Sequence, residues 1–148
     1  MARNEHVIAA TPANVFAVLA DGHSYEHWVV GCKRIRAVDA GWPHEGASFH
    51  HSVGVGPLLI RDTTTVVARD GQRSLRLKAR AWPAGAAHVD FELTPEGEGT
   101  RVVMVENPVD GPAKKLDNPV QQALIKLRNV ETLRRLGKLA EARVGARH

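Results

Sequence analysis

The middle of the chain is a series of short β-like runs separated by glycine- and proline-rich connectors. Connectors such as GVGP, RDGQ and PEGEG are too short to hold a helix, and connectors of this length and composition join neighbouring antiparallel strands. We therefore predict a meander of strands near Cys32–Asp39, Ala47–Val53, Leu58–Ala68, Ser74–Trp82, Ala87–Thr94 and Thr100–Asn107.

Two of these runs alternate clearly between apolar and polar residues. The first places Leu75, Leu77, Ala79 and Ala81 on one face and Arg76, Lys78, Arg80 and Trp82 on the other. The next places Val89, Phe91 and Leu93 opposite His88, Asp90 and Glu92. A period of two indicates a sheet with one buried face and one solvated face. The cationic outer row can lie beside the anionic outer row of its neighbour and help to fix the pairing.

Helices are predicted at both ends of this meander. A first strand over Asn4–Ala10 is followed by Thr11-Pro12, which is typical of a helix start because Thr caps and Pro suits the first turn. A second short helix is expected at Ser24–Trp28. Asn118-Pro119 begins a long helix that runs to about Ala142. The predicted class is α+β, in a single domain that spans residues 1–148.

The long helix carries an apolar residue at every third position. These residues are Leu124, Leu127, Val130, Leu133, Leu136 and Leu139. A spacing of three falls about 60° short of a full turn at each step, so the apolar stripe winds around the helix. A helix that crosses a twisted, curved sheet would meet different neighbours along its length. Gly137 would permit close backbone contact.

The element order and several local stretches resemble a known superfamily. The stretches are TPANVFAVLAD with the following HWV, GVGPLLIRDTTTVV, GTRVVMVENPVDGP and RNVETLRRLGKLAE. They are similar to the helix-grip (SRPBCC) superfamily, which includes START domains and birch-pollen-allergen-like proteins, and in particular to its polyketide cyclase/dehydrase-like branch. The resemblance implies a curved antiparallel sheet of about seven strands around a long C-terminal helix, with two short helices after the first strand. It also implies a largely apolar cavity between the sheet and the helix.

Strand alternation then indicates which side chains line such a cavity. Trp28 is expected to guard an entrance. The predicted ligand-binding residues are Trp28, Phe49, His51, Asp62, Thr64, Leu77, Ala79, Phe91, Met104, Glu106, Leu124 and Leu127. Leu75, Ala81, Val89, Leu93 and Val102 are further inward candidates. The alternative, a filled core without a cavity, stays open, although the alanines on the inner face favour a void.

Three of the inward positions carry groups that can move a proton. His51 and His50 point to opposite faces because they are successive strand residues, and His51 shares its parity with Phe49. By the same alternation Asp62, Thr64 and Glu106 face inward, and Asn129 on the helix could add a hydrogen bond. If His51, Asp62 and Glu106 converge, they form an acid–base site with at least one displaced pKa. The alternatives are a hydrogen-bonded structural histidine and carboxylates paired with Arg or Lys at the rim.

Composition and motifs restrict the remaining functions. We expect no metal site and no cofactor, because neither a metal-ligand motif nor a phosphate-binding loop occurs in the sequence. The net charge of +4 arises largely near the C-terminus, and aromatic residues make up only 5%, so we do not expect nucleic acid as a partner. The single cysteine, Cys32, and the lack of a long apolar run or signal-like start favour a cytoplasmic protein without a membrane span. A monomer and a homodimer are both expected possibilities.

The predicted function is binding of a hydrophobic or amphipathic small molecule of the lipid, aromatic or polyketide class. The first alternative is an enzyme of the polyketide cyclase or dehydratase type that uses His51, Asp62 or Glu106 as acid and base. The second alternative is an interaction module that uses the basic C-terminal helix.

Overall fold

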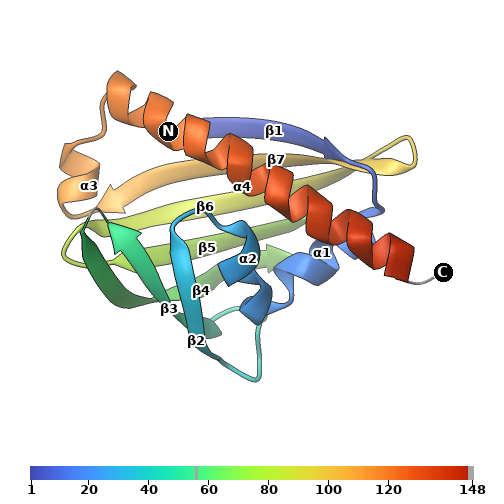
Figure 1. Ribbon diagram of the computed structural model, residues 1–148, viewed down its shortest axis with the longest axis horizontal. Helices are drawn as coiled ribbons and strands as arrows, with labels where there is room; N and C mark the ends of the chain where they lie inside the picture. Colours follow the sequence, from blue (N-terminus) through green and yellow to red (C-terminus); the bar gives the residue numbers. More distant parts are fainter. Residues whose placement is uncertain (56, 147–148) are drawn as a thin grey trace.

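Seven antiparallel strands form one curved sheet in the computed structural model, which describes residues 1–55 and 57–146 (Figure 1). The strand order across the sheet is β1-β7-β6-β5-β4-β3-β2. The meander is therefore confirmed, and the first strand joins it beside the last. The strands are β1 (Ala2–Ile8), β2 (Cys32–Val38), β3 (Ser48–Val55), β4 (Leu58–Asp70), β5 (Ser74–Ala81), β6 (Gly85–Glu96) and β7 (Gly99–Asp110).

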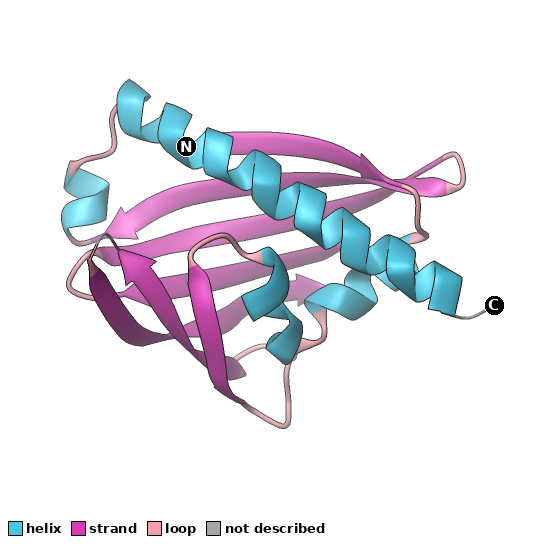
Figure 2. Ribbon diagram, viewed as in Figure 1, coloured by secondary structure: helices cyan, strands magenta, loops and turns pink. Residues whose placement is uncertain are grey.

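The helices all come from the two ends of the chain, and the longest, α4, runs across the sheet (Figure 2). They are α1 (Pro12–Leu19), the 3-10 turn η1 (Gly22–Ser24), α2 (Tyr25–Trp28), α3 (Pro112–Lys115) and α4 (Pro119–Ala146). This is the predicted α+β helix-grip architecture. The last strand extends beyond its predicted end at Asn107: β7 continues to Asp110, and the short helix α3 follows.

The predicted helix starts are confirmed by their caps. The Asn14 amide donates to Thr11 Oγ1 at 3.3 Å, and the Gln121 amide donates to Asn118 Oδ1 at 2.9 Å. Each side chain thus satisfies one of the backbone N–H groups that a helix start leaves without a partner. Pro12 and Pro119 each occupy the first helical position, where the absence of an N–H group costs nothing.

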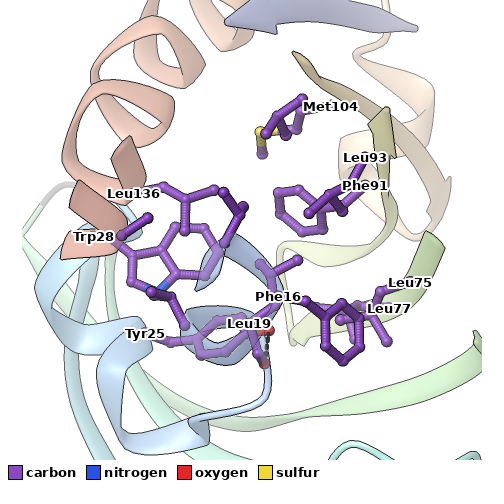
Figure 3. Close-up of a cluster of buried hydrophobic side chains, with 14 of the residues drawn as sticks. Phe16, Leu19, Tyr25, Trp28, Leu75, Leu77, Phe91, Leu93, Met104 and Leu136 are labelled. Atoms are coloured by element: carbon purple, nitrogen blue, oxygen red, sulfur yellow. Dashed lines mark hydrogen bonds between the residues drawn. The ribbon is translucent and has the colours of Figure 1, made fainter. Parts of the chain in front are cut away.

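A buried apolar cluster joins the C-terminal half of α4 to the sheet and to α1 and α2 (Figure 3). Leu133, Leu136 and Ala140 of α4 are buried in it. A side chain at Gly137 would come within 3.3 Å of Ile8 Cγ1 and 3.4 Å of His6 Nε2. The absence of a side chain there lets α4 lie close to β1, as the sequence suggested.

The first half of α4 departs from the prediction. Leu124 and Leu127 were expected to point inward, but they are 58% and 70% exposed. The reason is the spacing of three: Leu133 and Leu136 face the sheet, and each step back toward the N-terminus rotates the stripe by about 60°. Leu124 and Leu127 therefore lie on the outer side, and Ile125 and Asn129 take the inner positions.

On the outer face of the sheet, β5 pairs with β6 as the charge pattern predicted. Arg76 lies opposite Asp90 in the register. Its Nε and Nη2 donate to the two carboxylate oxygens of Asp90 at 2.7 and 2.9 Å. This two-point contact holds the register that places Leu75 and Leu77 on the inner, buried face.

Candidate functional site

A cavity of about 360 Å³ lies between the inner face of the sheet and the first half of α4. The cavity extends to the end of the sheet at which β3, β5 and β7 finish, since Gly54, Ala81 and Pro108, near the ends of these strands, line it. Ala113 of α3 and Gln121 of α4 line it at the same end. Nine of the twelve predicted ligand-binding residues line it: Trp28, Phe49, His51, Thr64, Leu77, Ala79, Phe91, Met104 and Glu106.

Small side chains keep this space open. Ala79 and Ala87 lie opposite each other in the β5–β6 register, and Ala81, Ala84 and Ala86 continue the same part of the wall. An alanine side chain is too short to reach α4, whereas the leucines earlier on β5, Leu75 and Leu77, are buried in the core. The change from Leu75 and Leu77 to Ala79 and Ala81 along β5 thus marks the passage from packed core to cavity.

The inner end of the cavity is aromatic. Trp28 is 0% exposed and lies 4.5 Å from Tyr25 and 5.8 Å from Phe91 between ring centroids. Its indole N–H donates to Ser24 Oγ at 3.1 Å. The expectation that Trp28 guards an entrance was wrong: the tight turn from η1 into α2 carries the ring into the interior, where it closes the cavity against the core.

His51 lies on the cavity wall and both of its ring nitrogens have partners. Nε2 lies 2.7 Å from the Arg80 carbonyl oxygen, and Nδ1 lies 3.0 Å from Thr64 Oγ1. Because a carbonyl only accepts, Nε2 carries the proton and the Thr64 hydroxyl donates to Nδ1. Burial is the largest cause that lowers the pKa of His51, and the Arg80 carbonyl opposes it. The ring is therefore a neutral, hydrogen-bonded wall residue.

Asp62 does not line the cavity, in contrast to the prediction. Its carboxylate accepts from the backbone amides of Thr63 at 2.8 Å and Trp82 at 3.0 Å. Arg80 Nε lies 3.8 Å away. Asp62 shares its parity with Thr64, but the β4–β5 pairing begins only at Thr64. Asp62 precedes this first pair, and its carboxylate binds the backbone amide of Trp82, just after the end of β5. This contact links β4 to the end of β5.

Glu106, Arg128 and Asn129 form a charged cluster on the opposite wall of the cavity. Arg128 Nη2 donates to both carboxylate oxygens of Glu106, at 2.6 and 2.7 Å. Asn129 Nδ2 donates to Glu106 Oε1 at 3.2 Å. The Glu106 side chain is 13% exposed and that of Arg128 is 40% exposed, so one end of the pair reaches water. In this arrangement Glu106 Oε2 has one protein donor and can accept a further hydrogen bond from a ligand.

The three predicted acid–base residues do not converge. Glu106 is on β7 and His51 is on β3, four strands apart in the sheet order, and adjacent strands are about 4.8 Å apart. The curvature of the sheet places both on one cavity, but on different walls. Asp62 lies outside the cavity. The arrangement therefore offers two separate polar positions within an apolar space.

The helix contributes wall residues that the sequence reading missed. Gln121, Ile125, Arg128 and Thr132 all line the cavity. Their spacing of three and four follows one face of α4, and this periodicity is the signal that could have identified them. Thr132 Oγ1 also accepts from the Val30 amide at 3.2 Å, which fixes the segment before β2 to the helix.

Cys32 is also on the wall. Burial raises the pKa of its thiol to about 11, and the negative charge of Glu26 adds to this effect. The thiol is therefore protonated at neutral pH and behaves as a small apolar wall group.

Within residues 1–55 and 57–146, no group of three or more His, Cys, Asp and Glu side chains gathers as a metal site. None of the helices in this part of the chain is long and apolar enough to cross a membrane.

Comparison with known proteins places the chain in a family. The family model described as polyketide cyclase/dehydrase and lipid transport matches residues 2–141, so the chain belongs to that family. No curated protein matches the chain.

Solved structures share the fold at low sequence identity. The Zhui aromatase/cyclase from Streptomyces sp. R1128 has 19% identity and a TM-score of 0.73, over 96% of this chain and 93% of that chain. A protein from Chromobacterium violaceum has 18% identity and a TM-score of 0.72, over 94% and 96%. A START superfamily protein from Mycobacterium smegmatis has 17% identity and a TM-score of 0.66, over 99% and 97%.

Proposed function

We propose that this member of the polyketide cyclase/dehydrase and lipid transport family binds an apolar small molecule that carries one polar group. The observation that carries the proposal is the cavity of about 360 Å³, whose wall is mainly apolar and holds one charged cluster at Glu106 and Arg128. Ligand pockets of proteins generally begin at about 300 Å³ and combine apolar walls with a few placed polar groups. The ligand class is therefore compact and lipid-, aromatic- or polyketide-like.

In such a complex, the burial of the ligand and its orientation would come from different wall residues. Apolar contact with Leu77, Phe91 and Met104 supplies the burial term, about 25 cal/mol per Å² before ordering costs. The polar group of the ligand fits beside Glu106 Oε2 and Arg128, because a buried polar atom without a partner is costly. A ligand hydroxyl that donates to Oε2 satisfies this position.

The test is direct binding of an apolar fluorescent probe, 8-anilinonaphthalene-1-sulfonate, with a cavity-filling variant. Ala79→Phe projects a ring into the space between β5 and α4, and we expect the affinity for the probe to fall about tenfold or more. The matched control is Ala37→Phe, which adds the same ring to an exposed position on β2. Equal probe binding by wild type and Ala79→Phe would show that the probe lies elsewhere and would overturn the proposal.

Native mass spectrometry of protein purified gently from its own host identifies the natural ligand class. A small molecule that stays bound to the wild type and is lost in Ala79→Phe supports the proposal. Spectra that show no bound molecule and no binding of added apolar ligands contradict it.

A second candidate function is acid–base catalysis of the cyclase or dehydratase type. The observation in its favour is the carboxylate of Glu106 inside an apolar cavity, a position from which it could take a proton from a bound ligand. Glu106→Gln separates the two functions. A carrier keeps most of its affinity for its ligand in this variant, whereas an enzyme loses turnover by a factor of about a hundred or more.

A further inference from the structure

The hydroxyl of Thr64 presents a hydrogen-bond acceptor at one end of the cavity. A threonine hydroxyl has one proton and two lone pairs, and Thr64 gives its proton to His51 Nδ1 at 3.0 Å. The proton on the other ring nitrogen of His51 goes to the Arg80 carbonyl at 2.7 Å. Neither side chain therefore has a proton left for a ligand, whereas the oxygen of Thr64 keeps lone pairs that a ligand donor can use.

The carboxylate of Glu106 presents a second acceptor on the opposite wall. Its Oε1 accepts from Arg128 and from Asn129, but its Oε2 accepts from Arg128 alone, at 2.7 Å. A carboxylate oxygen can accept two hydrogen bonds and donates none, so Oε2 has room for one ligand donor. Because Arg128 already balances the negative charge, a ligand ammonium would lose its hydration for little gain. An uncharged donor fits this position better.

The strand register sets the two acceptors apart. One inward row runs across β4, β5, β6 and β7 and consists of Thr64, Ala79, Ala87 and Pro108, all on the cavity wall. The next inward row, two residues further along β7, ends at Glu106. Three strand spacings thus separate Thr64 from Glu106, which amounts to about 14 Å on a flat sheet. The curvature of the sheet shortens the direct path between them (Figure 1).

The wall between the two acceptors is apolar. Ala79 and Ala87 follow Thr64 in its row and end at Cβ, so they leave space beside its hydroxyl. Phe91 and Met104 line the cavity on the side of the core. A rigid ring system can fill such a space without the loss of freedom that a flexible chain would undergo on binding.

A ligand that spans the cavity must bring a hydrogen-bond donor to Thr64. A carbonyl or ether oxygen placed there would meet only lone pairs. To donate to that oxygen, the Thr64 hydroxyl would have to leave His51 Nδ1, which would then be buried without a partner. This loss weakens binding by about tenfold or more. A hydroxyl group on the ligand has no such cost, because it donates to Thr64 Oγ1 and leaves the contact with His51 intact.

We propose that the cavity selects a rigid ring molecule with a hydroxyl group at each end, one held by Thr64 Oγ1 and the other by Glu106 Oε2. The inference rests on the ligand-binding function proposed above and adds a second polar group of defined type. Thr64 determines specificity in this arrangement, and His51 is a positioning residue that takes the proton of Thr64. Ketones and ethers of the same size are the ligands that the cavity rejects.

The experiment is isothermal titration calorimetry of the full chain with pairs of compounds that differ in one donor. Biphenyl-4,4′-diol is paired with its monomethyl ether, whose second oxygen can only accept. Naphthalene-2,6-diol and its monomethyl ether form a shorter pair, so that the result does not depend on one ligand length. We expect the wild type to bind at least one diol about tenfold or more tightly than the corresponding ether.

Variants of Thr64 test whether it is the acceptor. Thr64→Val has nearly the same shape but no oxygen, and we expect the ratio of the two affinities to fall to about one. Thr64→Ser restores the hydroxyl and should restore the ratio. Thr63→Val, whose side chain points to the other face of the sheet, should keep it. The ratio compares two ligands in the same protein, so a general loss of stability or affinity cancels.

The role of His51 has a separate readout. In His51→Phe the Thr64 hydroxyl loses its acceptor and is free to donate, so the ethers should bind about as tightly as the diols. A residue that merely supported the fold would weaken both members of a pair equally and leave the ratio high. A ratio that stays high in His51→Phe therefore overturns the role of His51 as a positioning residue.

The remaining outcomes separate this inference from the function on which it rests. A wild-type ratio near one for both pairs, or a ratio that Thr64→Val leaves unchanged, overturns the selection of hydroxyl groups. If Ala79→Phe loses compounds that the wild type binds without such selection, the ligand-binding function stands and this inference fails. If Ala79→Phe binds all the compounds like the wild type, they lie outside the cavity, and the ligand-binding function fails together with the inference.

Discussion

The hydroxyl of Thr64 donates to His51 Nδ1 across 3.0 Å, and this contact fixes the imidazole as a neutral group on the cavity wall. Phe49 and His51 follow each other on the inner face of β3, and their register partners on β4 are Thr64 and Asp62. The carbonyl of Arg80 accepts from the other ring nitrogen. Thr64 on β4 and Arg80 on β5 thus each bind one ring nitrogen of His51. The sheet, and not a ligand, sets the orientation of the ring.

Replacement of Thr64 by Val should destabilise the protein by about 1–3 kcal/mol, because Nδ1 of His51 is left buried without a donor. The two side chains have nearly the same shape, so packing changes little. The free energy of unfolding in urea measures the loss. Thr63→Val, on the less buried neighbouring position of β4, is the control. An equal loss in both variants would mean that the contact with His51 contributes nothing specific.

Stability should also fall as the pH is lowered below neutral, because of His51. Burial lowers the pKa of His51 in the folded protein below its usual value of 6.5. The unfolded chain therefore takes up a proton at a higher pH than the folded protein does, and protonation favours unfolding. This loss of stability is absent above about pH 7. It grows as the pH falls from about 6.5 toward the pKa of His51 in the folded protein, with a slope of at most about 1.4 kcal/mol per pH unit.

Urea unfolding at several pH values between about 7 and 5 measures this slope. His51→Gln should reduce the slope even if it lowers stability overall. The control is His44→Gln, an exposed histidine in the connector before β3. A slope that survives in His51→Gln would assign the pH dependence to other groups.

The sequence predicted the fold well because its signals are local. Alternation along Ser74–Ala81, short connectors and the caps at Thr11 and Asn118 each specify an element without reference to the rest of the chain. The phase of α4 is different. A stripe that winds around a helix does not reveal which of its members meet the sheet, so Leu124 and Leu127 were placed inside although they are exposed.

The site was predictable to the extent that strand parity applies. Parity placed His51 and Thr64 correctly on the wall because both lie within paired stretches of β3 and β4. It failed for Asp62, which pairs with His51 on β3 but lies beyond the first β4–β5 pair, where its carboxylate accepts from the Trp82 backbone amide. Arg128 was not foreseen as the partner of Glu106, because that contact depends on how α4 crosses the sheet.

The two members of the charged cluster should act on an anionic ligand in opposite directions. Glu106→Gln leaves the positive charge of Arg128 without a carboxylate partner, so the sulfonate of 8-anilinonaphthalene-1-sulfonate should bind several-fold more tightly. Arg128→Gln leaves the carboxylate alone and should weaken binding several-fold. Fluorescence titration at low and high salt gives both affinities. Glu131→Gln, on the outer side of α4 beside Arg134, is the control for a change of net charge. A shift in the same direction for both cluster variants would place the probe away from the cluster.

Stability should respond much less than affinity to these two substitutions. The pair joins a carboxylate that is 13% exposed to a guanidinium that is 40% exposed, and a pair that reaches water contributes about 1 kcal/mol or less. Urea unfolding of Glu106→Gln and Arg128→Gln should therefore remain within about 1 kcal/mol of the wild type. A loss of several kcal/mol would show that the cluster is part of the core and not of a binding wall.

The thiol of Cys32 should react slowly and with an unusual pH dependence. Burial, with a further contribution from Glu26, raises its pKa to about 11, so at pH 8 only about one thiol in a thousand is ionised. The rate of alkylation by iodoacetamide should therefore rise about tenfold per pH unit between about pH 8 and pH 10, with no plateau. Glutathione under the same conditions is expected to level off near its ordinary pKa. Glu26→Gln removes the nearby negative charge and should speed the reaction at each pH, whereas Glu45→Gln, an exposed glutamate in the connector before β3, should not. A plateau below pH 9 would show that Cys32 is hydrated and that this part of the cavity wall is open to water.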